Sequence, residues 1–122
     1  MAKPTKQEMD GAFFALNLEI QGTIEWMRAR FHARASAALP EGGRLWWTKI
    51  GQDWTLAVEH QEPGLDPVRS LLQSCAAYTR IDAARVLPEL LVEAEREEER
   101  LFALTREAAA AFAAVRLKGD DD

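Results

Sequence analysis

The sequence has little of what small proteins use to support a small core. Cys75 is the only cysteine among the 122 residues, which excludes an internal disulfide and a thiolate-rich zinc site. A single cysteine is typical of a reducing compartment. The chain also lacks a run of about 18 apolar residues that could cross a membrane, and no secretory signal follows its start. We therefore expect a cytoplasmic protein with no membrane partner.

Concentrated positive charge and histidine are also scarce. The formal net charge is −5, whereas binding to a phosphate backbone needs a dense basic surface. His32 and His60 are the only histidines, and neither lies in a metal-binding motif. Glycine-rich phosphate loops and a nucleophile elbow are missing as well. We expect no nucleic-acid partner, no metal, no cofactor and no catalytic residue.

What the chain does contain is helical periodicity at its start. Residues 5–8, Thr-Lys-Gln-Glu, form a capping box, and apolar residues then recur every three or four positions. The segment 39–43, Leu-Pro-Glu-Gly-Gly, ends this pattern. We predict a helix over residues 6–38, about 50 Å long at 1.5 Å per residue. A helix of this length needs a second long helix beside it.

The clearest β signal is a hairpin over residues 44–59, whose arms are rich in β-branched and aromatic residues around Gly51-Gln52. A two-residue loop pairs Lys49 with Trp54, Trp47 with Leu56, Leu45 with Val58 and Arg44 with Glu59. Leu45, Trp47, Trp54, Leu56 and Val58 then face the helices. A three-residue loop would shift the register and bury Trp46 instead of Trp47. In both cases the two adjacent tryptophans point to opposite faces, so one needs cover from elsewhere.

The second half of the chain is predicted to be mainly helical. A short helix over residues 67–77 follows the Asp66-Pro67 start signal, and a third strand over 68–72 is the alternative. A long helix over residues 80–117 should kink or split near Pro88. Residues 118–122 should form a disordered acidic tail. The whole is a single α+β domain in which two long helices pack antiparallel as a helical hairpin, with a small sheet across them.

The last helix carries an apolar heptad repeat, which Glu97 interrupts. Its first set of positions is Leu87, Ala94, Leu101, Ala108 and Val115, and its second set is Leu90, Leu104 and Ala111. This stripe, the long first helix and the second face of the hairpin together exceed what one copy of 122 residues can cover. We therefore expect self-association as a homodimer, and another protein is a second possible partner.

The function expected from these features is a non-catalytic protein–protein interaction or regulatory module. Its partner-binding residues would be Trp46, Trp47 and Ile50, because exposed tryptophan is enriched in binding hot spots. The alternative is a small-ligand or nucleotide-binding protein. In that case Arg28, Arg44 and Lys49 would line a pocket beside the tryptophans.

The acidic run over residues 93–99 raises two further hypotheses. It could hold magnesium for nucleotide hydrolysis, which requires more carboxylates from a facing helix. It could also imitate phosphate groups in an inhibitor of another protein. A simpler interpretation is a solvated helix face on which Arg96 and Arg100 form ion pairs with neighbouring glutamates.

Overall fold

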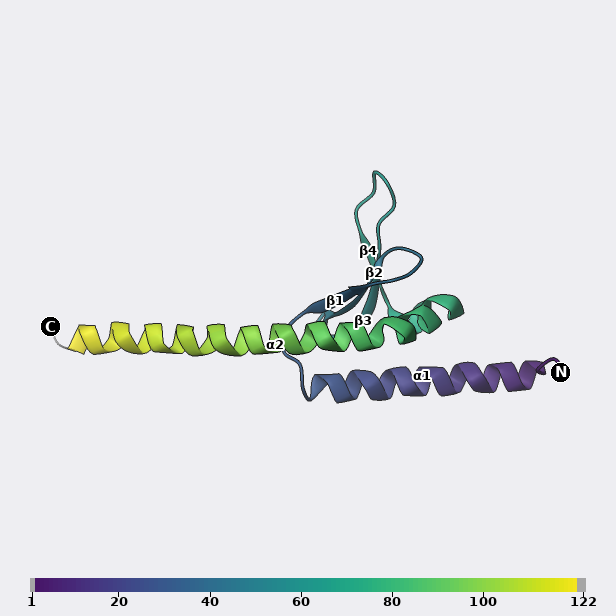
Figure 1. The fold of residues 1–122 in the computed structure, drawn as a ribbon, viewed down its shortest axis with the longest axis horizontal. Coiled ribbons are helices and arrows are strands. Elements are labelled where there is room, and N and C mark those ends of the chain that lie inside the picture. The colour runs from purple at the N-terminus through teal and green to yellow at the C-terminus, as the bar shows by residue number, and fades with distance from the viewer. Residues whose placement is uncertain (1, 121–122) are drawn as a thin grey trace.

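The computed structural model describes residues 2–120 as two long helices on one face of an antiparallel sheet (Figure 1). The sheet has the order β1-β2-β3-β4, so each strand pairs with the next one in the chain. The elements are α1 (Lys6–Arg28), β1 (Ala35–Ala38), β2 (Arg44–Ile50), β3 (Asp53–His60), β4 (Val68–Leu71), the 3-10 turn η1 (Leu72–Ser74) and α2 (Ala77–Asp120). The predicted α+β class is confirmed.

α1 begins as predicted and ends earlier. Thr5 Oγ1 accepts a hydrogen bond from the Glu8 amide at 3.1 Å, and the Glu8 carboxylate accepts one from the Thr5 amide at 3.2 Å. The helix stops at Arg28 and not at residue 38, because Ala35–Ala38 forms the edge strand β1. Alanine favours a helix locally. Pairing with β2 outweighs this preference and buries alternate residues of β1.

The central hairpin has the register predicted for a two-residue loop. Lys49 pairs with Trp54, Trp47 with Leu56, Leu45 with Val58, and Arg44 with Glu59. Gly51 supplies a positive φ of 64° at the turn, which a type II′ turn requires at its first central residue. Trp47 is therefore the buried tryptophan of the adjacent pair, and Trp46 points to the opposite face of the sheet.

The predicted helix over residues 67–77 is wrong, and the alternative strand is present. Residues 68–71 form β4 on the free edge of β3, where Val68 pairs with His60 and Leu71 with Ala57. An open strand edge offers unpaired backbone groups, and this pairing satisfies them. Only residues 72–74 form a short 3-10 turn before α2.

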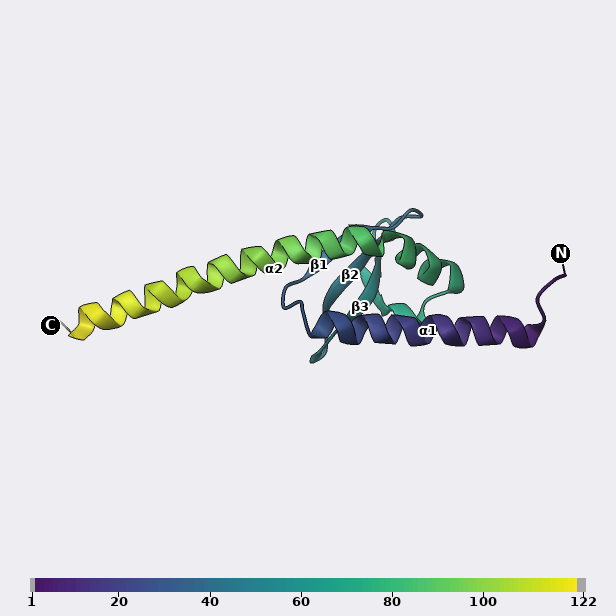
Figure 2. The ribbon, with the colours of Figure 1, turned by 60° about the horizontal axis from the view of Figure 1, so that its bottom comes forward.

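α2 is longer than predicted and remains one helix through Pro88. Figure 2 shows that its axis changes direction in its first part without a break. The helix continues through residues 118–120, which were expected in a disordered tail; residues 121 and 122 lie outside the described residues.

The two helices run in the same direction and do not form the expected antiparallel hairpin. Asn17 of α1 accepts a hydrogen bond from Arg80 near the start of α2 at 2.8 Å. His32, just after α1, contacts Glu98 much further along α2 at 2.7 Å. Both views show the same parallel course (Figures 1 and 2). The intervening strands carry the chain back to the starting end, which sequence periodicity alone does not reveal.

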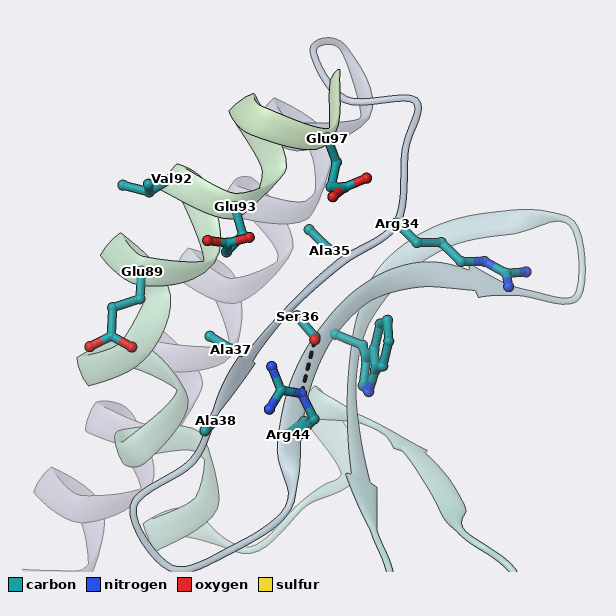
Figure 3. A pocket seen from close by; sticks show the side chains of 11 residues that line it. Arg34, Ala35, Ser36, Ala37, Ala38, Arg44, Glu89, Val92, Glu93 and Glu97 are labelled. Carbon is teal, nitrogen blue, oxygen red and sulfur yellow. Dashed lines mark hydrogen bonds between the residues drawn. The ribbon is translucent and has the colours of Figure 1, made fainter. Parts of the chain in front are cut away.

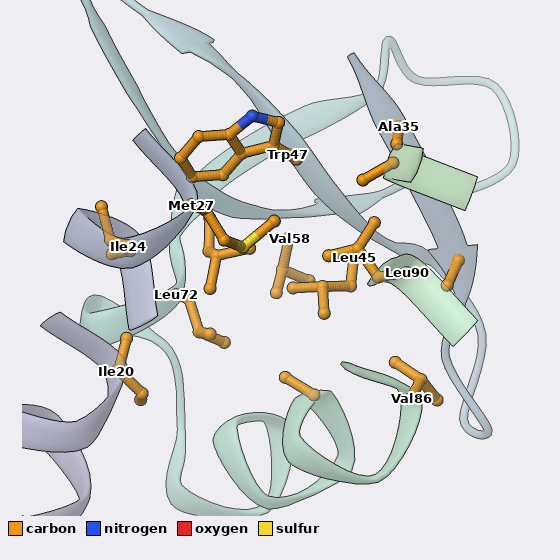
Figure 4. Close-up of a cluster of buried hydrophobic side chains, with 14 of the residues drawn as sticks. Ile20, Ile24, Met27, Ala35, Leu45, Trp47, Val58, Leu72, Val86 and Leu90 are labelled. Atoms are coloured by element: carbon orange, nitrogen blue, oxygen red, sulfur yellow. The ribbon is translucent and has the colours of Figure 1, made fainter. Parts of the chain in front are cut away.

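The core lies between the helices and the inner face of the sheet (Figure 4). Its fully buried side chains come from both helices and from β2 and β3: Ile24, Met27, Leu45, Trp47, Val58 and Leu90. The Trp47 ring stacks on the Trp54 ring with centroids 5.8 Å apart, and its Nε1 donates to the Phe31 carbonyl at 3.4 Å. Burying such side chains is the main stabilising contribution to the fold.

Both helices extend beyond the core, in opposite directions (Figure 1). Ile20 is the first buried residue described in α1, and Ala94 is the last described in α2. We call residues 99–120 the α2 arm. No residue of the arm whose burial is described is buried, so tertiary packing within one copy does not stabilise it.

Candidate functional site

Trp46 is a partly accessible member of the predicted partner-binding set. It is half-buried on the outer face of the sheet, with the Arg69 guanidinium 5.0 Å from its ring centroid. Its Nε1 is buried and has no hydrogen-bond partner among the described residues. Ile50 is also exposed, whereas Trp47 is fully enclosed in the core. A partner can therefore contact Trp46 and Ile50 but not Trp47.

The three cations predicted to bind a ligand lie on opposite sides of the sheet, Arg28 and Lys49 beside Trp54 and Arg44 beside Ser36. Arg28 donates from Nε to the Trp54 carbonyl at 2.7 Å, which fixes it at the end of α1. Lys49 pairs with Trp54 and points toward the inner side of the sheet. Arg44 lies on the outer side and donates to the Ser36 hydroxyl at 2.9 Å. The predicted constellation is not assembled.

A groove of about 630 Å³ lies between β1 and α2. Figure 3 shows three carboxylates along its helical wall, Glu89, Glu93 and Glu97. Arg34, Arg44 and Trp46 also line the groove. The groove thus carries both acidic and basic groups, a charge pattern that suits a zwitterionic or mixed-charge ligand.

The acidic side of this groove is partly neutralised within α2. Arg96 contacts Glu93 at 2.6 Å, and Arg100 lies 3.9 Å from Glu97. These are the ion pairs expected for a solvated helix face. Among residues 2–120, no group of three His, Cys, Asp or Glu side chains is placed to hold a metal ion.

The α2 arm carries an exposed apolar face in line with the core. Eighteen residues make five full turns of an α-helix, at 3.6 residues per turn. The core-facing residues Ala83, Val86, Leu90 and Ala94 therefore share their direction with Leu101, Leu104, Ala108 and Phe112. The first four are buried and the second four are exposed. We call Leu101, Leu104, Ala108, Phe112 and the adjacent Val115 the arm face.

A second cavity, which we call the root pocket, lies where the arm leaves the core. Its volume is about 470 Å³, and its lining is largely apolar: His32, Glu98, Glu99, Leu101, Phe102 and Thr105. Glu98 accepts hydrogen bonds from the His32 amide and contacts the His32 ring, both at 2.7 Å. This contact ties the segment after α1 to the base of the arm.

The Glu98 carboxyl responds to two opposing influences. Partial burial alone would raise its pKa. Hydrogen bonds from the His32 side chain and from the backbone of His32 and Ala33 act in the other direction, so the pKa lies below its ordinary value of 4.5. Glu98 is therefore a carboxylate at neutral pH and leaves negative charge beside the root pocket.

Sequence reasoning identified part of this site. The heptad repeat included Leu101, Leu104, Ala108 and Val115, but it missed Phe112 because a seven-residue period drifts on a straight helix. Comparing residues 18 positions apart along α2, which point in the same direction, would have identified Phe112. The contact between His32 and Glu98 joins residues far apart in the chain, and no local pattern in the sequence indicates it.

Comparison with known protein families, curated proteins and solved structures finds no match to this chain. Within residues 2–120, no helix is both long and apolar enough to span a membrane.

Proposed function

We propose that this protein is a non-catalytic interaction module of the cytoplasm that works as a homodimer formed through the α2 arm. The observation that carries this proposal is the arm face. Apolar residues there continue the line of α2 that packs on the sheet, at positions that one copy leaves exposed. A contiguous apolar surface of this kind typically marks an interface.

The free length of the arm supports the same proposal. Its 22 residues extend about 33 Å at 1.5 Å per residue. Single helices in water are marginally stable unless an apolar face is packed. Phe112 and Val115 are 74% and 70% exposed. Covering side chains of this size contributes about 1.5–3 kcal/mol each, so a second helix along the arm would stabilise it substantially.

Light scattering of the purified chain tests this proposal. We expect the mass of a dimer at micromolar concentration. Leu104→Glu and Val115→Glu should each give a monomer, because each puts a charge into the covered face. Ala103→Glu and Ala110→Glu add the same charge on the other side of the arm and should leave the dimer intact. A wild-type protein that stays monomeric up to millimolar concentration would contradict the proposal.

A small-ligand-binding function is the second candidate, and the groove between β1 and α2 favours it. Its volume of about 630 Å³ falls within the usual range for ligand sites, and it combines Trp46 with Arg44 and three glutamates. A nucleotide at 100 times its dissociation constant would add about 2.7 kcal/mol to stability. A thermal-shift screen with nucleotides, with Trp46→Ala as the control, tests this function. No shift with any nucleotide would count against it.

A further inference from the structure

We infer that the two copies pack their α2 arms antiparallel, with a two-fold axis at Ala108, and that each root pocket receives Phe112 of the other copy. This inference depends on the proposed homodimer and names its geometry. The arm projects clear of the rest of the chain, so the arm of a second copy has room to lie along it (Figure 1). Each pocket is then completed by a residue of the partner.

The placement of large and small residues favours this register. With the axis at Ala108, Leu101 lies level with the partner's Val115, and Leu104 lies level with the partner's Phe112. Ala108 meets its own copy, and a small side chain there lets the two helices approach closely. Position 120 lies level with position 96 of the partner, just below the start of its arm. Residues 99–117 of the two arms are therefore paired, and residues 118–120 reach the level of the partner's His32–Glu98 contact.

Charge distinguishes the antiparallel arrangement from a parallel one. With the axis at Ala108, Arg116 and Lys118 lie level with positions 100 and 98 of the partner, beside the glutamates at 97–99, and Asp120 lies level with Arg96. Antiparallel packing therefore sets Arg116 and Lys118 of each arm beside glutamates at the base of the other. Parallel packing would place like charges side by side, which is unfavourable at this spacing.

The root pocket is positioned to bind two side chains of the partner. At 100° per residue, Phe112 points about 20° and Arg116 about 60° to one side of Leu101. Thr105 and Glu98 point about 40° and 60° to the same side of Leu101. A two-fold axis between two antiparallel helices brings this side of one helix next to the same side of the other. The partner's Phe112 thus faces the apolar lining, and the partner's Arg116 faces the Glu98 carboxylate beside His32.

Disulfide trapping tests the direction and register of the pair. In a Cys75→Ala background, Ala108→Cys should cross-link to itself under mild oxidation. Leu101→Cys should not, because the two copies of position 101 are about 21 Å apart along the axis. Mixing Leu101→Cys with Val115→Cys should give a cross-linked heterodimer. Self-linking of both Leu101→Cys and Val115→Cys would indicate a parallel pair and overturn the inference, while the homodimer itself would stand.

A charge exchange tests the contact between Glu98 at the root pocket and the partner's Arg116. Arg116→Glu should raise the dimer dissociation constant about tenfold or more, because it sets two carboxylates together. Glu98→Arg should do the same, and the double variant Glu98→Arg/Arg116→Glu should recover most of the affinity. Arg106→Glu, on the far side of the arm, is the matched control. A double variant no tighter than either single one would overturn the assigned contact, and a wild-type monomer would instead refute the proposed function.

Discussion

Among single residues, the adjacent tryptophans Trp46 and Trp47 have opposite environments. Trp47 is enclosed and donates to the Phe31 carbonyl, whereas the Trp46 N–H is buried without a partner among residues 2–120. We expect Trp47→Phe to lower the free energy of unfolding by about 1–3 kcal/mol, through a cavity and a lost hydrogen bond. Trp46→Phe should change it by less than about 0.5 kcal/mol, because the removed N–H contributes no bond.

Urea unfolding of the two variants measures this difference directly. Because both substitutions are Trp→Phe, the change in volume and in hydrogen-bonding capacity is matched. Equal destabilisation by the two would contradict the assignment of Trp47 to the core and Trp46 to the outer face.

Glu98 gives a prediction about acid stability. Its pKa is lowered in the folded chain, by hydrogen bonds from His32 that outweigh partial burial. A lowered pKa stabilises the fold above the unfolded-state value and loses that contribution as the pH falls through the folded value. Stability should therefore fall below about pH 4.5, and Glu98→Gln should show a smaller fall.

Urea midpoints at pH 7 and pH 3 give this comparison, with Glu95→Gln as the control on an exposed part of the same helix. The Glu98→Gln protein should lose less between the two pH values than the wild type or the control. Parallel losses in all three proteins would show that the contact with His32 does not couple to folding.

At the scale of the elements, Gly43 has a conformation that requires glycine, whereas Gly22 lies in a helix where glycine is merely tolerated. Gly43, in the turn before β2, has a φ of 82°, and a Cβ there would approach the Glu59 carbonyl oxygen to 2.5 Å. Gly22 in α1 has nothing within 4 Å of such a Cβ. Gly22→Ala should stabilise the fold by about 0.5–1 kcal/mol, through helix propensity. Gly43→Ala should destabilise it by more than about 1 kcal/mol.

Thermal or urea unfolding of these two variants, each a single Gly→Ala change, checks the prediction. A neutral or stabilising effect of Gly43→Ala would contradict the close approach of β2 to the end of β3. A destabilising effect of Gly22→Ala would mean that another chain packs against that side of α1.

The elements differ in how far the sequence determines them. The β2–β3 hairpin could be predicted to within one residue, because alternation defines its two faces and Gly51 favours the two-residue turn. β1 was not predicted, and β4 was predicted only as the alternative to a helix, because Ala35–Ala38 and Val68–Leu71 have no strong strand pattern of their own. They become strands by pairing with the two free edges of that hairpin, a tertiary effect that local propensity does not contain.

For the whole molecule, the sequence indicated an excess of apolar surface without its location. Periodicity suggested that the two helices would cover each other, yet both pack on the sheet and run in the same direction. Part of the uncovered surface consequently lies on the arm face, and another part lies on α1, where Phe14 and Leu18 are exposed. Only Trp46 of the adjacent tryptophans remains accessible. The relative direction of the two helices depends on how the strands between them return the chain. The root pocket was not predicted for the same reason, because it forms where the segment after α1 meets α2.

The separation of core and arm leads to the last prediction. Truncation after Thr105 removes part of the chain in which no residue described as buried occurs, and it keeps the contact between His32 and Glu98. The shortened protein should keep its sheet and change its monomer unfolding free energy by less than about 1 kcal/mol, since little area is lost. It should also be monomeric, because it lacks Ala108, Phe112 and Val115.

Circular dichroism, urea unfolding at low protein concentration and light scattering together measure these outcomes. Loss of the fold on truncation would mean that the arm stabilises the core of its own copy. A folded but still dimeric product would place the interface away from the arm, at the outer face of the sheet around Trp46 or at the exposed Phe14 and Leu18 of α1. We expect a folded monomer, because the core is stable without the arm and the arm packs only against the partner copy.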